Sequence, residues 1–220
     1  MRSALTLALI PVLALSAVTF AAPAVAAEPS GQVAISELLA ELVTASPSTK
    51  TYDRSLFVHW IDADGDGCDT RQEVLIAESR IPVEMGSGCT VVSGQWYSWY
   101  DGATWTNPSD VDIDHVVALG EAWRSGADKW TADRRRNFAN DLGLDVSLEA
   151  VTDNVNQSKG DRDPAEWLPP LSEVNCEYAT DWVLVKYRWN LTVDTTELDA
   201  LNQIITGACA STVVTVPPKG

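Results

Sequence analysis

The stretch VDIDHVVAL, residues 111–119, decides the fold that we predict for this chain. Polar and apolar residues alternate up to His115 and then give way to an apolar run, which indicates a strand that passes from a half-exposed position into the core. A second strand is predicted at residues 147–151, followed by a helix that carries Asn156 and Lys159. Because residues three apart share one helix face, we expect these two side chains to point the same way.

The residue types in these segments suit the hydrolysis of a phosphodiester bond. This reaction needs a base for the attacking water and a cation that offsets the charge of the phosphate. His115 can act as the base, because an imidazole has a pKa of ~6.5. Magnesium, or manganese in its place, takes one or two carboxylates from a protein, so Asp114 and the amide oxygen of Asn156 form a minimal ligand set. Asp112 shares a strand face with Asp114 and is a reserve ligand.

The motifs DHVVAL and NQSKGD resemble the HNH-type nucleases of the His-Me finger, or ββα-metal, group. The wider pattern is similar to that of secreted bacterial HNH endonuclease-family proteins, and it consists of GCDTR, DIDHVVALGEAW, FANDL, NVNQSKGDRDPAEWLPP and VKYRW. This resemblance covers most of the mature chain. It implies a metal-dependent endonuclease whose products are 5′-phosphates and 3′-hydroxyls.

The resemblance also implies roles for single residues. His115 corresponds to the general base, Asp114 and Asn156 to the metal ligands, and Lys159 to a residue near a phosphate. A solvated helix lysine is the alternative for Lys159. Asn140 is the candidate for the middle asparagine of an HNH motif, and a hydrogen bond that orders its loop is the alternative role.

Two further residues are candidates for the catalytic set. Arg71, in the GCDTR motif, is predicted to reach the scissile phosphate, since a guanidinium fork fits phosphate oxygens. An exposed arginine at a helix start is the alternative. Glu121 follows the DHVVAL strand closely enough to orient His115 or to hold a metal-bound water, and a surface position is its alternative.

The stretch DADGDGCDTRQE, residues 62–73, matches a calcium-binding EF-hand loop. Its acids at loop positions 1, 3, 5 and 12 are Asp62, Asp64, Asp66 and Glu73. The TRQE at its end also spells a helix capping box, so an acidic turn before a capped helix is the other interpretation. The rival function class therefore is a non-enzymatic, calcium-stabilised binding module that uses this loop.

The first 27 residues read as a secretory signal peptide, with Arg2, an apolar run and a small-residue cleavage site at residues 24–26. We therefore expect a secreted, extracellular protein without a membrane span. Its four cysteines suit an oxidising compartment. The pairs Cys68 with Cys89 and Cys176 with Cys209 are favoured because each joins neighbours in sequence, although two other pairings are possible.

The formal net charge is −16, and it becomes −17 when Arg2 leaves with the signal peptide (−16 − 1). This charge counts against a tight nucleic-acid binder. It does not count against an enzyme, which needs only a local positive strip such as Arg134, Arg135 and Arg136.

The remaining pattern predicts an α+β fold, with helices around a small antiparallel sheet, an embedded ββα-metal (HNH) motif and two disulfides. Short strands are expected within residues 89–105, where Asp101-Gly102 signals a tight turn. Helices are expected at residues 35–43, 52–61, 71–79, 120–130, 131–142 and 174–189, and after the N-cap Asp194. Residues 28–210 form one nuclease domain in this prediction, and residues 211–220 form a flexible tail. The predicted function is that of a monomeric secreted endonuclease that cleaves DNA, with RNA as an open alternative, and has little sequence preference.

Overall fold

The structure is a computed structural model, and it describes residues 31–220. The predicted signal peptide, residues 1–27, lies outside the described residues. None of the described helices is both long enough and apolar enough to cross a membrane. The helices are α1 (Ile35–Glu41), α2 (Thr70–Glu78), α3 (Leu119–Arg124), α4 (Ala132–Ala139), α5 (Asp153–Lys159), α6 (Asn175–Trp189) and α7 (Thr195–Gly207). The strands are β1 (Gln32–Ala34), β2 (Glu84–Met85), β3 (Val91–Ser93), β4 (Trp96–Tyr97), β5 (Thr104–Trp105), β6 (Val111–His115), β7 (Leu148–Thr152) and β8 (Val213–Thr215). Short 3₁₀ turns are η1 (Arg54–Leu56), η2 (Pro108–Asp110), η3 (Ala127–Lys129), η4 (Asp145–Ser147) and η5 (Ser172–Val174).

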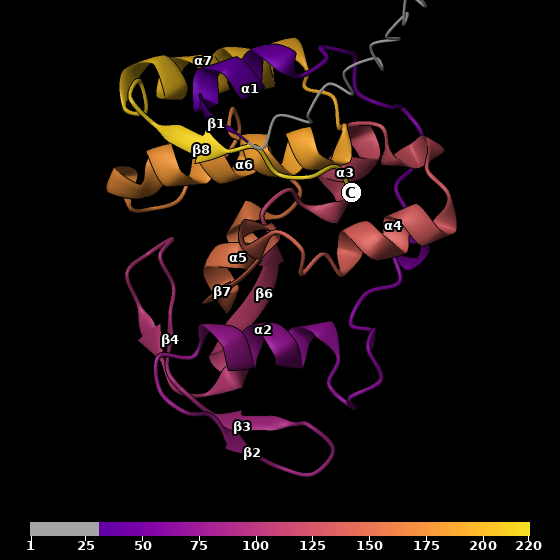
Figure 1. Cartoon of the computed structure of the whole chain (residues 1–220), viewed down its shortest axis with the longest axis vertical. Helices are drawn as coiled ribbons and strands as arrows, with labels where there is room; N and C mark the ends of the chain where they lie inside the picture. Colours follow the sequence, from indigo (N-terminus) through magenta and orange to yellow (C-terminus); the bar gives the residue numbers. More distant parts are fainter. Residues whose placement is uncertain (1–30) are drawn as a thin grey trace, which may run out of the picture.

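A layer of three helices forms one part of the molecule, with α1 and α7 packed along α6 (Figure 1). α6 buries most of its side chains, including Tyr178 and Trp182, because elements cover it on several sides. Full burial of such side chains stabilises the fold by about 1.5–3 kcal/mol each. α7 begins at the predicted capping box, in which Asp194 accepts a hydrogen bond from the backbone of Glu197 and the Glu197 side chain accepts one from the backbone of Asp194.

The antiparallel pair β6–β7 forms the centre of the other part, and its register runs from Val111 opposite Thr152 to His115 opposite Leu148. Alternate residues of a strand point to opposite faces. Ile113 packs in an apolar cluster with residues of α2, β3 and β4, whereas the polar residues of β6 meet α5. The strand pair therefore lies between α2 on one face and α5 on the other (Figure 1).

The fold class is confirmed as a mixture of helices and short antiparallel strands. Both favoured disulfides, Cys68–Cys89 and Cys176–Cys209, are present. The expected single small sheet is wrong in one respect. Among the described residues the strands form four separate two-stranded sheets, β1–β8, β2–β3, β4–β5 and β6–β7. None of these strands is longer than five residues, and each pairs with one neighbour.

Three local predictions differ from the structure. Residues 52–61 are not a helix, because the chain forms only η1 there and Trp60 adopts φ +58°. The predicted capping box at the start of α2 is wrong, since Asp69 caps this helix by accepting from the backbone of Gln72. The predicted loose tail is wrong for Val213–Thr215, which pairs as β8 with β1. That partner strand lies near the other end of the chain, where a local pattern gives no indication of it.

Candidate active site

Three of the predicted residues meet at one cavity at the end of β6. Asp114 and His115 are the last residues of β6, and Asn156 lies on α5, which begins directly after β7. Since no loop separates β7 from α5, the strand pair fixes where the helix lies. The cavity has a volume of about 190 Å³, and its lining consists of Arg54, Ile113, Asp114, His115, Ala118, Leu119, Asn156, Gln157, Gly160 and Asp161.

The imidazole of His115 is held in one orientation. Its Nε2 lies 2.9 Å from the backbone oxygen of Ala139, and the side chain is almost fully buried. Because a carbonyl oxygen only accepts hydrogen bonds, Nε2 carries the proton and Nδ1 keeps its lone pair. Burial lowers the pKa of His115 to about 3, and the charges of Arg54 and Lys159 add to this effect. The ring is therefore neutral at physiological pH, and Nδ1 can accept a proton from a water molecule.

Two aromatic rings enclose this imidazole. The ring centroid of Trp60 lies 5.6 Å from that of His115 at an interplanar angle of 25°, and the centroid of Phe138 lies 6.3 Å away at 21°. Trp60 has φ +58°, a left-handed conformation that costs a residue other than glycine about 1–3 kcal/mol. Contacts around Trp60 must offset this strain. In this backbone conformation the Trp60 ring covers one face of His115.

Asn140 supplies those contacts. Its Oδ1 accepts hydrogen bonds from the backbone of Ile61 at 3.2 Å and from the hydroxyl of Thr70 at 2.9 Å. Its Nδ2 donates to the backbone oxygens of Val58 and Arg136, each at 2.8 Å. Both polar atoms of the Asn140 side chain are therefore hydrogen-bonded, and the residue does not line the cavity. This position fits a residue that orders its loop better than one that contacts the substrate.

Asp114 lies at the centre of a buried polar cluster. The Tyr100 hydroxyl donates to its Oδ2 at 2.7 Å, and the Lys159 ammonium lies 2.8 Å from both carboxylate oxygens. Burial raises the pKa of Asp114 and lowers that of Lys159, and their mutual attraction opposes both shifts. A carboxylate offers about four acceptor positions, so these contacts leave capacity for a cation.

Asn156 offers a second oxygen to the same cavity. Its Nδ2 donates to Oδ2 of Asp112 at 3.3 Å, which leaves the amide oxygen as the atom available to a cation. Asp112 supports Asn156 in this way and does not line the cavity itself. One carboxylate and one amide oxygen are hard ligands of the kind that magnesium accepts, so the donor set fits such an ion.

Lys159 and Glu121 are both buried, and neither lines the cavity. The Lys159 side chain is 0% exposed and also donates to the backbone oxygen of His115, so it cannot contact a phosphate in this conformation. Glu121 neither orients His115 nor lies at the surface. It is buried and accepts hydrogen bonds from Lys186 and Ser125. In both cases a buried partner of opposite charge balances the charge of the side chain.

Arg71 is also placed away from the cavity. Its Nη2 donates to the backbone oxygens of Pro108 at 2.8 Å and Val111 at 3.0 Å. These contacts hold the start of β6, so the predicted contact with the scissile phosphate has no support in this geometry.

Arg54, Trp60 and Tyr100 also contact the residues of this cavity or line it, and local sequence patterns do not predict these positions. Arg54 lines the cavity, Trp60 covers His115 and Tyr100 donates to Asp114. The first two come from the segment TYDRSLFVHW, residues 51–60, which lies more than 50 positions before His115. No local spacing signals such a contact.

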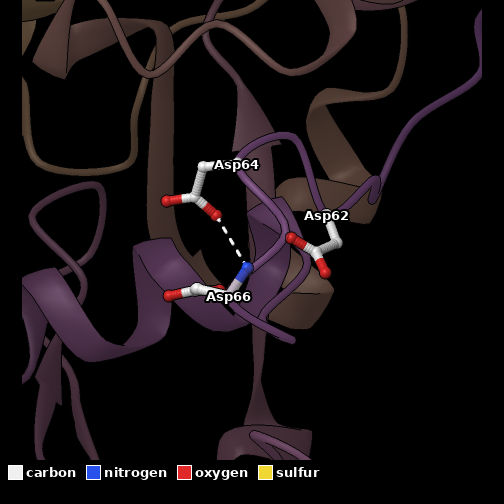
Figure 2. A group of neighbouring side chains, drawn as sticks. All are labelled: Asp62, Asp64 and Asp66. Atoms are coloured by element: carbon white, nitrogen blue, oxygen red, sulfur yellow. Dashed lines mark hydrogen bonds between the residues drawn. The ribbon is translucent and has the colours of Figure 1, made fainter.

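The acidic loop after this segment brings three carboxylates together. Figure 2 shows Asp62, Asp64 and Asp66 around one turn, and one oxygen from each lies within 4.8 Å of the others. The backbone amides of the loop donate to all three side chains, as an acidic turn without an ion also requires. Glu73 has a buried Oε2 without a hydrogen-bond partner among the described residues, and its pKa is raised by burial and by the neighbouring acids. Calcium binding at this loop stays a prediction.

Comparison with known proteins gives two matches. The sequence model of a family described as GmrSD restriction endonucleases, C-terminal domain, matches residues 85–204, which is more than half of the chain. An "Uncharacterized secreted protein" of Arthroderma benhamiae (strain ATCC MYA-4681 / CBS 112371) is 46% identical over 177 residues, which cover 80% of this chain and 85% of that protein. No solved structure matches the chain. The matched family range contains Asp114, His115 and Asn156 but neither Arg54 nor Trp60.

Proposed function

Because the chain belongs to the family of GmrSD restriction endonucleases, C-terminal domain, we propose that it is a secreted nuclease of the HNH type that hydrolyses DNA. The protein is secreted, in agreement with the description of its fungal relative and with its two disulfides. The fungal relative also means that the resemblance is not limited to bacterial proteins.

One observation carries the proposal: a neutral imidazole with a free Nδ1 shares a small cavity with a carboxylate and an amide oxygen. These groups are His115, Asp114 and Asn156. In the proposed reaction Nδ1 of His115 takes a proton from water while the water oxygen bonds to phosphorus. The bond from phosphorus to the 3′ oxygen breaks, and this oxygen takes a proton from a second water molecule, which yields a 5′-phosphate and a 3′-hydroxyl.

Each supporting residue has a defined task in this proposal. Asp114 and Asn156 would hold magnesium or manganese, whose charge offsets that of the phosphate. The hydrogen bond of Asp112 keeps the Asn156 amide oriented. Lys159 and Tyr100 keep the Asp114 carboxylate in place. The general base needs no reorientation, because Ala139 and Trp60 already fix its ring.

The substrate follows from the family and from the charge of the chain. A nuclease acts on nucleic acid, and we propose DNA cleavage with little sequence preference, with RNA as a second substrate to be tested. A net charge of −16 disfavours tight, sequence-independent binding, so we expect weak binding of DNA and fast release of products. A non-enzymatic calcium-stabilised module is not favoured, because the matched family consists of nucleases.

Digestion of plasmid DNA by the mature protein tests the proposal. We expect cleavage with magnesium, no cleavage with EDTA, and a rate lowered by at least about 100-fold in His115→Ala, as is typical for the loss of a general base. His59→Ala is the matched control, because His59 is the other histidine of the chain and its ring bonds only to the backbone of Phe57 and packs on Trp60. Equal rates for wild type and His115→Ala would refute the role of His115, and equal loss in both variants would indicate a packing effect.

A further inference from the structure

Arg54 is the one lysine or arginine among the described residues that line the cavity of Asp114 and His115. Arg54 is exposed, whereas Asp114 and His115 beside it in the cavity are buried. The other charged groups of the lining are Asp114 and Asp161. A phosphate that enters this cavity would therefore meet two acids and a single cationic side chain.

The cations that the sequence suggested for a phosphate are engaged elsewhere. Lys159 is fully buried and directs its ammonium at Asp114 and the backbone of His115. Arg71 donates to two backbone oxygens at the start of β6. Among these three residues, Arg54 alone is exposed and reaches the cavity.

The backbone around Arg54 is fixed although it lies outside the longer helices. Asp53 caps η1 by accepting from the backbone of Ser55 at 2.9 Å and from its hydroxyl at 2.7 Å. Phe57 follows η1 and is 1% exposed, and Arg135 donates to the backbone oxygen of Leu56. The buried ring and these hydrogen bonds hold the turn against α4, so Arg54 is presented to the cavity from a rigid position.

We propose that Arg54 binds the phosphate of the nucleic-acid substrate in this cavity, an inference that rests on the proposed function. A planar guanidinium can donate to two oxygens of one phosphate at once, which positions the phosphorus atom opposite His115. The segment that carries Arg54 precedes residues 85–204, so the N-terminal part of the chain adds this contact to the matched family region.

Cleavage kinetics give the first test, with Arg54→Gln, Arg54→Lys and the control Arg80→Gln. Arg80 is exposed and its guanidinium lies over the ring of Tyr97, so its loss removes the same charge without touching the cavity. We expect Arg54→Gln to lower kcat/KM for DNA by on the order of 100-fold, as for the loss of one donor to a transition state. Arg54→Lys should retain part of the activity, and Arg80→Gln should stay close to wild type. Unchanged thermal melting of all three variants would exclude a folding effect.

Binding gives the second test and separates this inference from the proposed function. A fluorescent DNA oligonucleotide is titrated with His115→Ala in magnesium, with and without Arg54→Gln, over a series of salt concentrations. Loss of one phosphate contact should weaken binding and lower the slope of log Kd against log salt by about 1. If wild type cleaves DNA while Arg54→Gln behaves as Arg80→Gln in both tests, Arg54 is not the phosphate ligand and the nuclease proposal stands. If wild type cleaves nothing, the nuclease proposal fails and the binding slope alone decides on Arg54; absence of binding overturns both.

Discussion

Two lysines with fully buried side chains, Lys186 and Lys159, differ in the acids that they meet. The Lys186 ammonium contacts Glu121 at 2.8 Å and Glu197 at 2.6 Å. Burial alone would lower its pKa, but the two carboxylates outweigh burial and raise it. The Lys159 ammonium contacts the single carboxylate of Asp114, and burial prevails and lowers its pKa.

The difference separates a structural ion cluster from one at the candidate active site. Lys186 joins α6 to α3 and α7, and with Ser125 it satisfies groups that have no access to solvent. Lys159 holds a carboxylate that also faces a cavity and is still able to take a cation. We therefore expect Lys186 to matter mainly for stability and Lys159 mainly for activity.

The largest effect is expected from Lys186→Met. It would leave Glu121 and Glu197 buried without a cation, and breaking a buried ion pair costs about 3–5 kcal/mol. Urea unfolding at pH 7 measures the loss. Lys129→Met is the control, because Lys129 is exposed on η3. Similar unfolding midpoints for the two variants would show that the cluster does not hold the fold.

Lys159→Met is expected to lower the stability less than Lys186→Met does, and it is also expected to lower the nuclease activity. Asp114 keeps the Tyr100 hydroxyl and can take up a proton, so we expect a cost of about 1–3 kcal/mol. The double variant Lys159→Met with Asp114→Asn removes both charges and should recover most of this stability. Urea unfolding and plasmid cleavage are measured on the same samples. Full cleavage by the stable double variant would show that Asp114 is dispensable for the reaction.

The two lysines also show which parts of the structure the sequence could predict. The strands on both sides of the active site, α5 and the capping box of α7 follow from local patterns, and the structure agrees with them. The burial of Lys159 and Glu121 could not be predicted, because a charged side chain is normally solvated and its partner is remote in sequence. Glu121 meets Lys186 65 positions later.

The same limit applies to the candidate active site. Local patterns predicted that Asp114, His115 and Asn156 lie together, because a strand end and a helix carry recognisable residue types, and the three residues line one cavity. Arg54 and Trp60 were missed because a segment without regular periodicity brings them there, through a buried Phe57 and the hydrogen bonds of Asn140. Such contacts depend on packing between segments that are distant in sequence, and the local sequence does not indicate which segments pack together.

The last effect depends on pH, and it is expected at a buried acid that no lysine pairs with in the described part of the chain. Asp181 on α6 is 6% exposed, and burial followed by the charge of Glu177 raises its pKa to about 8. Burial also raises the pKa of Glu78 to about 7 and that of Glu149 to about 9. The folded state therefore binds protons that the unfolded chain releases above pH ~4. The stability that these protonated acids contribute is fully present at pH ~4 and is lost as pH rises through about 7 to 9.

Asp181→Asn isolates one part of this pH dependence. An amide imitates the protonated acid, so the variant should melt above wild type at pH 9, and the difference should shrink as the pH falls toward 5. Melting curves of both proteins across this pH range measure the difference. Glu177→Gln is the control: it removes the neighbouring charge and should raise the melting temperature less, because burial is the larger cause. If the melting temperatures of wild type and Asp181→Asn change with pH in the same way, the buried carboxylate of Asp181 is already stabilised by its surroundings. The absence of a lysine would then not distinguish it from the acids around Lys186.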